Sequence, residues 1–471
     1  MRLTRREVIG GGAAAALAGT GIYALVDRLA TAPVRRSSRP AIPEQHVLGD
    51  LRVVVDEGVE VVVPPLHDEV VTATVRVAGD PAALRDAQRI LEEALRAVDA
   101  AFDAAPSGVS VSVGWGLPYF RRFVAGPARE RLPVDLRASK AGGRQVPAII
   151  DAIRFPSDPA DLILEENDVA FFFRGDRQRV IGEASAMTFE ATEGLFELTS
   201  IRRGFAGGGF DGSRSLPKRM ALAAGIPGAE LIPDTAELFL GFTSTQKAGL
   251  GPPGIANFET LPGYTDQWPD GYFRGGTAMH VSHMFEDVEA WYLNFDFSER
   301  VSTTFRPGMD VPQGRQTVSQ EPDDAVGADA VARDARRHGA VGHSAVVQPA
   351  SRLQADVVGR DGVLYPKGTA VPQRADFNTL DNPFFWSARP EIDRQSDDPA
   401  AGLHFVVFTP TSEDFHRTRL AMDGIFPDGT SLPLHPRARG QGFNSILQST
   451  HRQNFLVPPR RHRSFPLAEL L

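Results

Sequence analysis

A glycine-rich stretch from Gly204 to Gly212 carries a single acidic residue, Asp211. Glycine lets a backbone approach a bound group closely and adopt positive φ angles. A carboxylate held in such a loop is suited to moving protons on a flat cofactor or a small substrate. The same composition is typical of a solvent-exposed turn in which the aspartate caps the following helix. Asp211 is therefore a candidate catalytic acid or base, and the rest of the chain has to decide between the two interpretations.

The residue types present limit the chemistry. The chain has no cysteine, which excludes disulfides, thiolate nucleophiles, iron–sulfur clusters and cysteine-ligated haem or zinc. Any metal must be bound by histidine, by carboxylates or by another oxygen donor. No spacing of histidines and acids typical of a zinc or non-haem iron site occurs. His280 and His283 lie three apart in a strand-like run, so they point to opposite faces.

The first thirty residues indicate export. Arg5 and Arg6 precede a mildly apolar run, Gly10 to Val26, that is built largely of Ala and Gly. This pattern is typical of a Tat-type signal, and a chance arginine pair before a short anchor helix is the alternative. Ala30 to Ala32 has a small-x-small cleavage pattern, but Pro33 would then sit at the scissile bond. The segment is thus also a candidate membrane tether. Tat export places the protein in the cell envelope, the periplasm or outside the cell, and implies folding before transport, often around a cofactor.

Composition sets the scale of the fold. The chain has 471 residues, of which 42% are hydrophobic, and a formal charge of −9. After about 45 residues of signal and linker, this length suits one large or two ordinary domains. No further apolar run is long enough to span a bilayer. The net negative charge argues against nucleic acid as a partner.

The first half of the chain alternates between strand and helix patterns. Asp80 and Pro81 are typical of an N-cap and a first helical residue, and an apolar helix face follows from Leu84 to Phe102. This order of elements predicts an α+β sandwich of the ferredoxin-like kind. The further elements expected here are strands at Val70–Val77, Val109–Val113, Asp168–Phe173 and from Leu195, and a helix at about Asp176–Phe189.

The second half repeats this order. A long polar segment, Pro307 to Asp376, interrupts it, and insertions of that length are usually functional or disordered. We therefore predict a duplicated fold with a signal and linker at 1–45 and domains at 46–204 and 205–471. The elements expected here are strands at Thr277–His283 and Leu403–Phe408, helices at Glu286–Trp291 and Thr411–Met422, and a short helix at Ala325–Arg337 in the insertion.

Five short motifs occur in order along the chain. They are Gly108 to Gly116 with its Gly-Trp-Gly ending, Gly208 to Gly212, Gly275-Gly276-Thr277 leading to Trp291, Gly402 to Phe408, and Phe455 to Pro459. Together they resemble the dye-decolourising (DyP-type) peroxidases of the chlorite-dismutase-like superfamily, over roughly residues 60 to 470. The resemblance implies two ferredoxin-like domains of the dimeric α+β barrel type, with haem b in the second.

The same resemblance implies roles for individual residues. Asp211 matches the family's distal aspartate, and Arg389 is the best match for its distal arginine, with a surface ion-pair partner as the alternative. Gly208, Gly212 and Phe405 would lie at the haem. Cleavage of a peroxide needs a proton moved between its oxygens, which a carboxylate can do, and a cation for the departing oxygen, which an arginine supplies.

The chain departs from the family on the other side of the haem. The ligating histidine normally precedes an Asn-Pro pair by a few residues, but Phe377 stands at that place before Asn382-Pro383. A phenyl ring cannot bind iron. His343, in the insertion, and His404, in the late strand, are the candidate replacements. For each of them a structural or surface histidine is the alternative.

Two functions fit these observations. The first is an exported haem peroxidase that uses hydrogen peroxide to oxidise an organic reductant. The second is a non-catalytic cell-envelope protein of the same fold that binds haem, another porphyrin or a different ligand, which Phe377 favours. Either could form a homo-oligomer.

Overall fold

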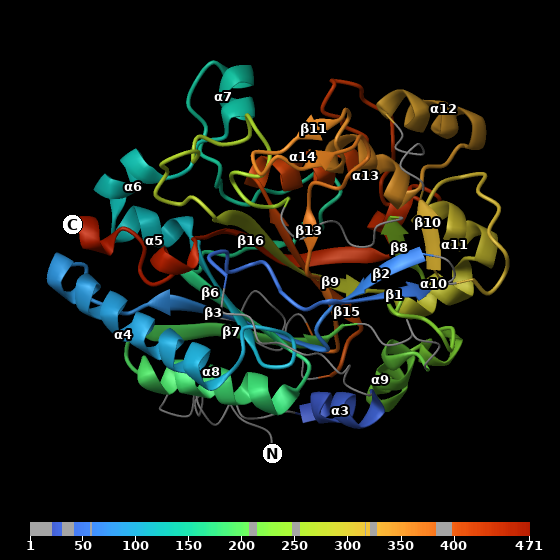
Figure 1. The fold of residues 1–471 in the computed structure, drawn as a ribbon. Coiled ribbons are helices and arrows are strands. Elements are labelled where there is room, and N and C mark those ends of the chain that lie inside the picture. The colour runs from blue at the N-terminus through green and yellow to red at the C-terminus, as the bar shows by residue number, and fades with distance from the viewer. Residues whose placement is uncertain are drawn as a thin grey trace.

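The computed structural model describes residues 21–30, 42–56, 59–206, 214–246, 255–315, 317–320, 327–382 and 398–471. The twin arginine of the predicted export signal lies outside these residues. Among the described residues, no helix has the length and apolar character needed to cross a membrane. Figure 1 shows the arrangement of the elements.

The first half is a ferredoxin-like unit. Its strands follow the order β7-β3-β6-β4, and all neighbours are antiparallel. Helices α4 and α8 lie next to each other and cover one face of this sheet (Figure 1). The elements are β3 (His67–Val75), α4 (Pro81–Ala101), β4 (Ser110–Gly116), β6 (Val169–Gly175), α8 (Gln178–Ala191) and β7 (Phe196–Phe205). Every element that we expected between residues 70 and 201 is present, within a few residues of its predicted ends.

Helix α4 begins where the sequence predicts. The Asp80 side chain accepts hydrogen bonds from the backbone N–H groups of Ala82 and Ala83, at 3.1 and 3.0 Å, and Pro81 is the first helical residue. Its apolar residues, spaced three and four apart, are buried against the sheet and α8. Local capping and periodicity therefore suffice to define this helix.

The second half has the same topology. Its strands follow the order β16-β9-β15-β14, again antiparallel. Thr411 and Asp414 form the capping box that starts helix α14. The elements are β9 (Thr277–Glu286), α10 (Val288–Asn294), β14 (Phe377–Thr379), β15 (Gly402–Thr409), α14 (Ser412–Met422) and β16 (Leu447–Val457). The predicted duplication is confirmed, although β14 was not expected from the sequence and β16 was expected only as a closing motif.

The two sheets join into one closed barrel. Strand β4 pairs with β16 through Gly116↔Phe455 and Trp115↔Leu456, and β7 pairs with β14 through Phe205↔Asn378. Apolar side chains from both halves, among them Phe172, Val281 and Val406, fill the interior. The predicted α+β barrel of two ferredoxin-like units is confirmed. Its two seams, where β4 meets β16 and where β7 meets β14, are short.

The insertion before β14 is folded over the outer face of the second sheet (Figure 1). The short helix predicted there is present as α12, and α13 packs against α14. Strand β13 pairs with β15 just ahead of β14, along the same edge. Helix α11 (Phe297–Thr304) precedes the insertion. The elements within it include α12 (Ala328–His338), α13 (His343–Ser351), β11 (Val357–Val358), β12 (Leu364–Tyr365) and β13 (Gln373–Arg374).

The remaining elements surround this barrel. The domain boundaries at 46–204 and 205–471 stay a prediction. The elements are η1 (Gly21–Leu25), α3 (Val26–Leu29), β1 (Arg52–Asp56), β2 (Val59–Val63), α5 (Leu117–Arg122), α6 (Ala125–Arg131), α7 (Leu136–Gly142), β5 (Ile163–Leu164), α9 (Leu216–Ala224), η2 (Ala229–Leu231), β8 (Thr243–Gln246), β10 (Thr317–Gln320), η4 (Gly442–Ser445), η5 (Arg460–His462) and η6 (Ala468–Leu470).

Candidate functional site

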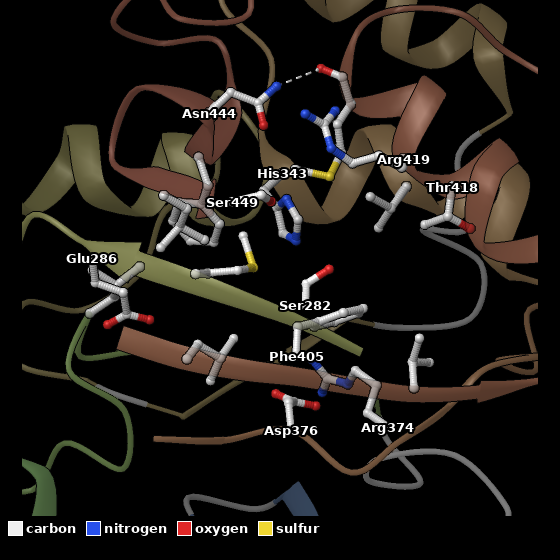
Figure 2. A pocket seen from close by; sticks show the side chains of 18 of the residues that line it. Ser282, Glu286, His343, Arg374, Asp376, Phe405, Thr418, Arg419, Asn444 and Ser449 are labelled. Atoms are coloured by element: carbon white, nitrogen blue, oxygen red, sulfur yellow. Dashed lines mark hydrogen bonds between the residues drawn. The ribbon is translucent and has the colours of Figure 1, made fainter. Parts of the chain in front are cut away.

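A cavity of about 400 Å³ lies between the outer face of the second sheet and the helices that cover it. Strands β9, β13, β14 and β15 supply one wall, and α13, α14 and η4 supply the other (Figure 2). Apolar atoms make up most of the wall surface, and many polar and charged side chains are interspersed among them. This size and composition are typical of a site for a small molecule or cofactor.

Strand alternation decides which residues reach the cavity. In β9, Ser282, Met284 and Glu286 face it, whereas Val281 lies in the barrel interior. In β15, Leu403, Phe405 and Val407 face the cavity, and Val406 and Phe408 point inward. The predicted cofactor-binding residue Phe405 is therefore part of the cavity wall.

His343 is the histidine that the covering helices contribute. It is the first residue of α13, and its ring points into the cavity toward the strand that carries Ser282 (Figure 2). Gly342 permits this placement, because a Cβ there would lie 2.1 Å from the Phe305 carbonyl oxygen. The ring packs 4.8 Å from that of Phe443. Its Nδ1 is buried and has no hydrogen-bond partner among the described residues.

The imidazole of His343 is held neutral. Burial lowers its pKa to about 4, and the positive charges of Arg374 and Arg419 add to this shift. A neutral imidazole keeps a nitrogen lone pair, which is what a metal needs from a histidine ligand. Among the candidates named from the sequence, His343 is thus the one placed to donate to a group in the cavity.

Two carboxylates reach the cavity from the sheet. Glu286 ends β9, is only 4% exposed, and its Oε2 has no partner within the described part of the chain. Burial raises its pKa to about 8, and the charge of Asp376 adds to the shift. Glu286 therefore carries a proton at neutral pH. Asp376 lies beyond β13, on the sheet side of the cavity (Figure 2).

Arginines make the cavity a suitable site for anionic groups. Arg374 comes from β13 on the sheet side, and Arg352, Arg419, Arg437 and Arg452 reach it from other segments. Burial lowers the pKa of Arg352 to about 10, and Arg374 contributes to this. Guanidinium groups in such a partly apolar setting bind carboxylates or phosphates through two parallel hydrogen bonds.

Asp158 joins two of these arginines. Its Oδ1 accepts a hydrogen bond from Arg452 at 2.8 Å and one from Arg419 at 3.2 Å. Arg419 also lies 3.1 Å from the Asp423 carboxylate. The network is almost entirely buried and fixes both guanidinium groups at the cavity wall.

His404 does not line the cavity. It points into the barrel, where its ring centroid is 4.1 Å from that of His283 and 5.0 Å from that of Phe377. These three residues are register neighbours on β15, β9 and β14. Burial lowers the pKa of His404 well below its usual range, with Arg202 and His451 adding to the shift. The structure thus separates the two histidine candidates.

Phe377 also faces the barrel interior. Its ring stacks on Phe172 at 6.0 Å and is 1% exposed, while Asp376 and Asn378 on either side of it line the cavity. The phenyl ring therefore does not stand where a ligand in this cavity would have to stand.

The remaining predicted site residues cannot be compared with this geometry. Asp211, Gly208, Gly212 and Arg389 lie outside the described residues. Ala206, the last residue before the first of these gaps, lines the cavity.

Sequence reasoning missed Arg374, Asp376 and Glu286. Glu286 shares a strand face with Ser282, and this period of two could have pointed to it. Arg374 and Asp376 offered no comparable signal, because β13 and β14 are too short to show a period of two. In the described ranges, no group of three or more His, Cys, Asp and Glu side chains is placed to hold a metal ion. A metal held mainly by a cofactor needs fewer protein ligands.

Solved structures with the same fold exist. The chain is similar to a putative dyp-type peroxidase from Shewanella oneidensis, with 15% identity, a TM-score of 0.50, and coverage of 89% of this chain and 98% of that chain. It is also similar to the encapsulated DyP-type peroxidase from Mycobacterium smegmatis, with 15% identity, a TM-score of 0.48, and coverage of 85% and 95%. At 15% identity, the likeness to the Shewanella oneidensis structure shows the fold alone. No curated protein matches the chain. A family model matches residues 65–459, and the chain accordingly belongs to DUF7405, a family of unknown function.

Proposed function

We propose that this protein is a haem peroxidase of the dye-decolourising type, which uses hydrogen peroxide to oxidise an organic reductant. The observation that carries the proposal is the position of His343: a half-buried side chain whose neutral imidazole points across a cavity with mainly apolar walls toward Arg374, Asp376 and Glu286. The shared fold with a putative dyp-type peroxidase supports it. The twin arginine ahead of an apolar run supports export by the Tat pathway.

The residues present fit haem b. His343 would be the axial ligand, because a neutral imidazole is the usual nitrogen donor to haem iron. Arg352 and Arg419 suit the two propionates, and the apolar side chains suit the porphyrin edge. Bound haem would supply the two electrons that reduce the peroxide.

The sheet wall supplies the acid–base groups. Cleavage of the O–O bond needs a proton moved from one oxygen to the other, and a carboxylate on the sheet side is suited to carry it. Arg374 stabilises the negative charge that develops on the departing oxygen. Asp211 remains a prediction for the same proton transfer. Glu286, protonated at neutral pH, is a second proton source at this wall.

A second candidate is a haem-binding protein of the same fold without peroxidase activity. It is favoured by one observation: Nδ1 of His343 has no carboxylate or other hydrogen-bond partner among the described residues. Ligating histidines usually donate this proton to a carboxylate or carbonyl, which makes them stronger donors.

The test is an absorption spectrum of the full chain produced with haem available, followed by oxidation of a phenol or dye with hydrogen peroxide. We expect a Soret band and peroxide-dependent turnover, and both should be lost in His343→Ala. His338→Ala, on an exposed residue five positions earlier, is the matched control. A Soret band without turnover would select the second candidate, and a folded chain that takes up no haem would reject both.

A further inference from the structure

The end of the apolar run that resembles an export signal is part of the folded body. Residues 21–29 form η1, which contacts β7, and α3, which lies against α9 (Figure 1). Tyr23 and Val26 are 4% and 0% exposed. They pack in a cluster with Phe205, Leu216 and Met220. The segment thus buries its apolar side chains in protein.

Polar contacts fix the segment in one position. The Tyr23 hydroxyl donates to Asp381 Oδ1 at 3.0 Å, lies 3.0 Å from Thr379 Oγ1, and accepts from the Leu380 N–H at 2.9 Å. Burial and the charge of Asp381 raise the pKa of Tyr23 well above its usual range, so the hydroxyl keeps its proton. Thus a single buried hydroxyl donates to Asp381 and accepts from Leu380, directly after β14, and contacts Thr379, the last residue of that strand.

Two further contacts join the same segment to the body. Asp27 Oδ1 lies 2.6 Å from Nε2 of the buried His67, on β3. Arg219, on α9, donates to the carbonyl of Leu29 at 2.6 Å. The segment is therefore held near its start by the contacts of Tyr23 and near its end by β3 and α9.

The contacts of Tyr23 lie where β7 meets β14, which is the shorter of the two junctions between the halves of the barrel. Strands β7 and β14 share one residue pair, Phe205↔Asn378. Beyond it, Thr379 Oγ1 donates to the Arg203 carbonyl and the Arg203 N–H donates to Asp381 Oδ2, both at 2.7 Å. Tyr23 binds the same Thr379 and Asp381 side chains. It therefore stabilises the place where the two halves of the barrel meet, next to the cavity residue Asn378.

This docked position excludes a bilayer-spanning one. With residues 21–29 in the body, the apolar run retains Gly10 to Thr20, which would reach about 16 Å as a helix. The hydrocarbon core of a bilayer is about 30 Å thick and needs about 20 apolar residues. The chain therefore cannot both keep these contacts and cross a membrane through this run.

We propose that residues 21–29 are a permanent clamp on the seam between β7 and β14, kept in the mature protein. On this proposal, cleavage after Ala32 does not occur, and the segment is neither a removable leader nor a membrane anchor. The proposal rests on contacts within the polypeptide, so it stands or fails independently of haem binding and peroxidase activity.

The first test is the intact mass of the full chain after production in a bacterium with a working Tat pathway and purification from the exported fraction. We expect a mass that includes residues 21–30. A mature chain that begins at Pro33 or later would overturn the proposal.

The second test compares two tyrosine variants of the full chain. Tyr365 is a matched control, because its hydroxyl also donates to a carboxylate, that of Asp361 at 2.7 Å, but only four residues away in the same hairpin. We expect Tyr23→Phe to lower the melting temperature more than Tyr365→Phe does, or to prevent folding while Tyr365→Phe folds. Equal melting temperatures for the two variants would contradict a clamp at the seam.

Discussion

The ring centroid of Phe377 lies 5.0 Å from that of His404. Both rings are inside the barrel, on the opposite side of the sheet from the cavity. From the sequence, Phe377 stands where a haem ligand of the DyP-type peroxidases would be expected, which argues against a peroxidase. The structure removes that argument, because successive residues of a strand point to opposite faces. Asp376 and Asn378 reach the cavity and Phe377 does not.

This relationship predicts the behaviour of Phe377→His. The new imidazole would lie in the barrel core, beside His404 and His283, and could not reach a group in the cavity. We expect the haem spectrum to be unchanged. The free energy of unfolding should fall by roughly 3 kcal/mol, because an apolar ring is lost and an unpaired polar ring is buried. Denaturant unfolding and the Soret band measure the two effects.

Phe377→Leu is the control for this variant. It should cost less stability, about 1 kcal/mol, because it keeps an apolar side chain of similar volume. A haem spectrum that changes toward two histidine ligands in Phe377→His would place residue 377 at the haem after all.

Much of the fold could be predicted because its elements are locally defined. The Asp80 cap, the apolar face of α4 and the Thr411–Asp414 capping box fix helix ends without help from distant residues. Strand β14 could not be predicted in this way. It has three residues, Phe377 to Thr379, and exists only because β7 and β15 flank it.

The site was less predictable than the fold for a related reason. His343 could be named as one of several candidates, but only the packing of α13 over the sheet separates it from His404. Glu286 and Arg374 are ordinary charged residues in the sequence. They become part of a site because helices α13 and α14 cover their side of the sheet.

Glu286 should make the stability of the protein fall as pH rises. Its pKa is about 8 when folded, against about 4.5 for an exposed glutamate, so the folded state holds a proton that the unfolded chain has lost. The stabilisation that comes from this bound proton is complete below pH 4.5 and is lost as pH rises toward 8. The loss between pH 5 and pH 8 is on the order of 3 kcal/mol.

Glu286→Gln tests this stabilisation, because glutamine cannot ionise. We expect the variant to gain stability relative to wild type on the order of 3 kcal/mol from pH 5 to pH 8. Glu289→Gln, on the exposed face of α10, should run parallel to wild type. Thermal or denaturant unfolding across this pH range measures the difference, and parallel curves for Glu286→Gln would show that the carboxylate is not buried as described.

Arg374 is expected to act in the reaction with peroxide. Arg374→Leu removes the cation at the sheet wall, so kcat/KM for hydrogen peroxide should fall roughly 10²-fold while haem remains bound. Arg374→Lys keeps the charge but not the planar fork, and should lie between leucine and wild type. Steady-state kinetics measure kcat/KM for each variant, and the Soret band checks that each one contains haem. Full activity in Arg374→Leu would assign the role to another residue.

Asp158 should matter more for stability than an acid with equally short contacts on the surface. It is the shared partner of Arg419 and Arg452, and the Arg452 side chain is 1% exposed. Asp158→Asn removes the charge partner of Arg452 and leaves Arg419 with Asp423 alone. We expect a loss of roughly 3–5 kcal/mol in the free energy of unfolding.

Asp151→Asn is the matched control for this change. Asp151 pairs with Arg121 at 2.6 Å, but both side chains are more than half exposed, so its loss should cost about 0–1 kcal/mol. Because Arg419 and Arg452 also line the cavity, an anionic ligand there should offset part of the Asp158→Asn loss. Urea unfolding of both variants with and without haem measures this. Equal losses in the two variants would show that the Asp158 network is not a buried one, and a loss in Asp158→Asn that haem leaves unchanged would place the propionates away from these arginines.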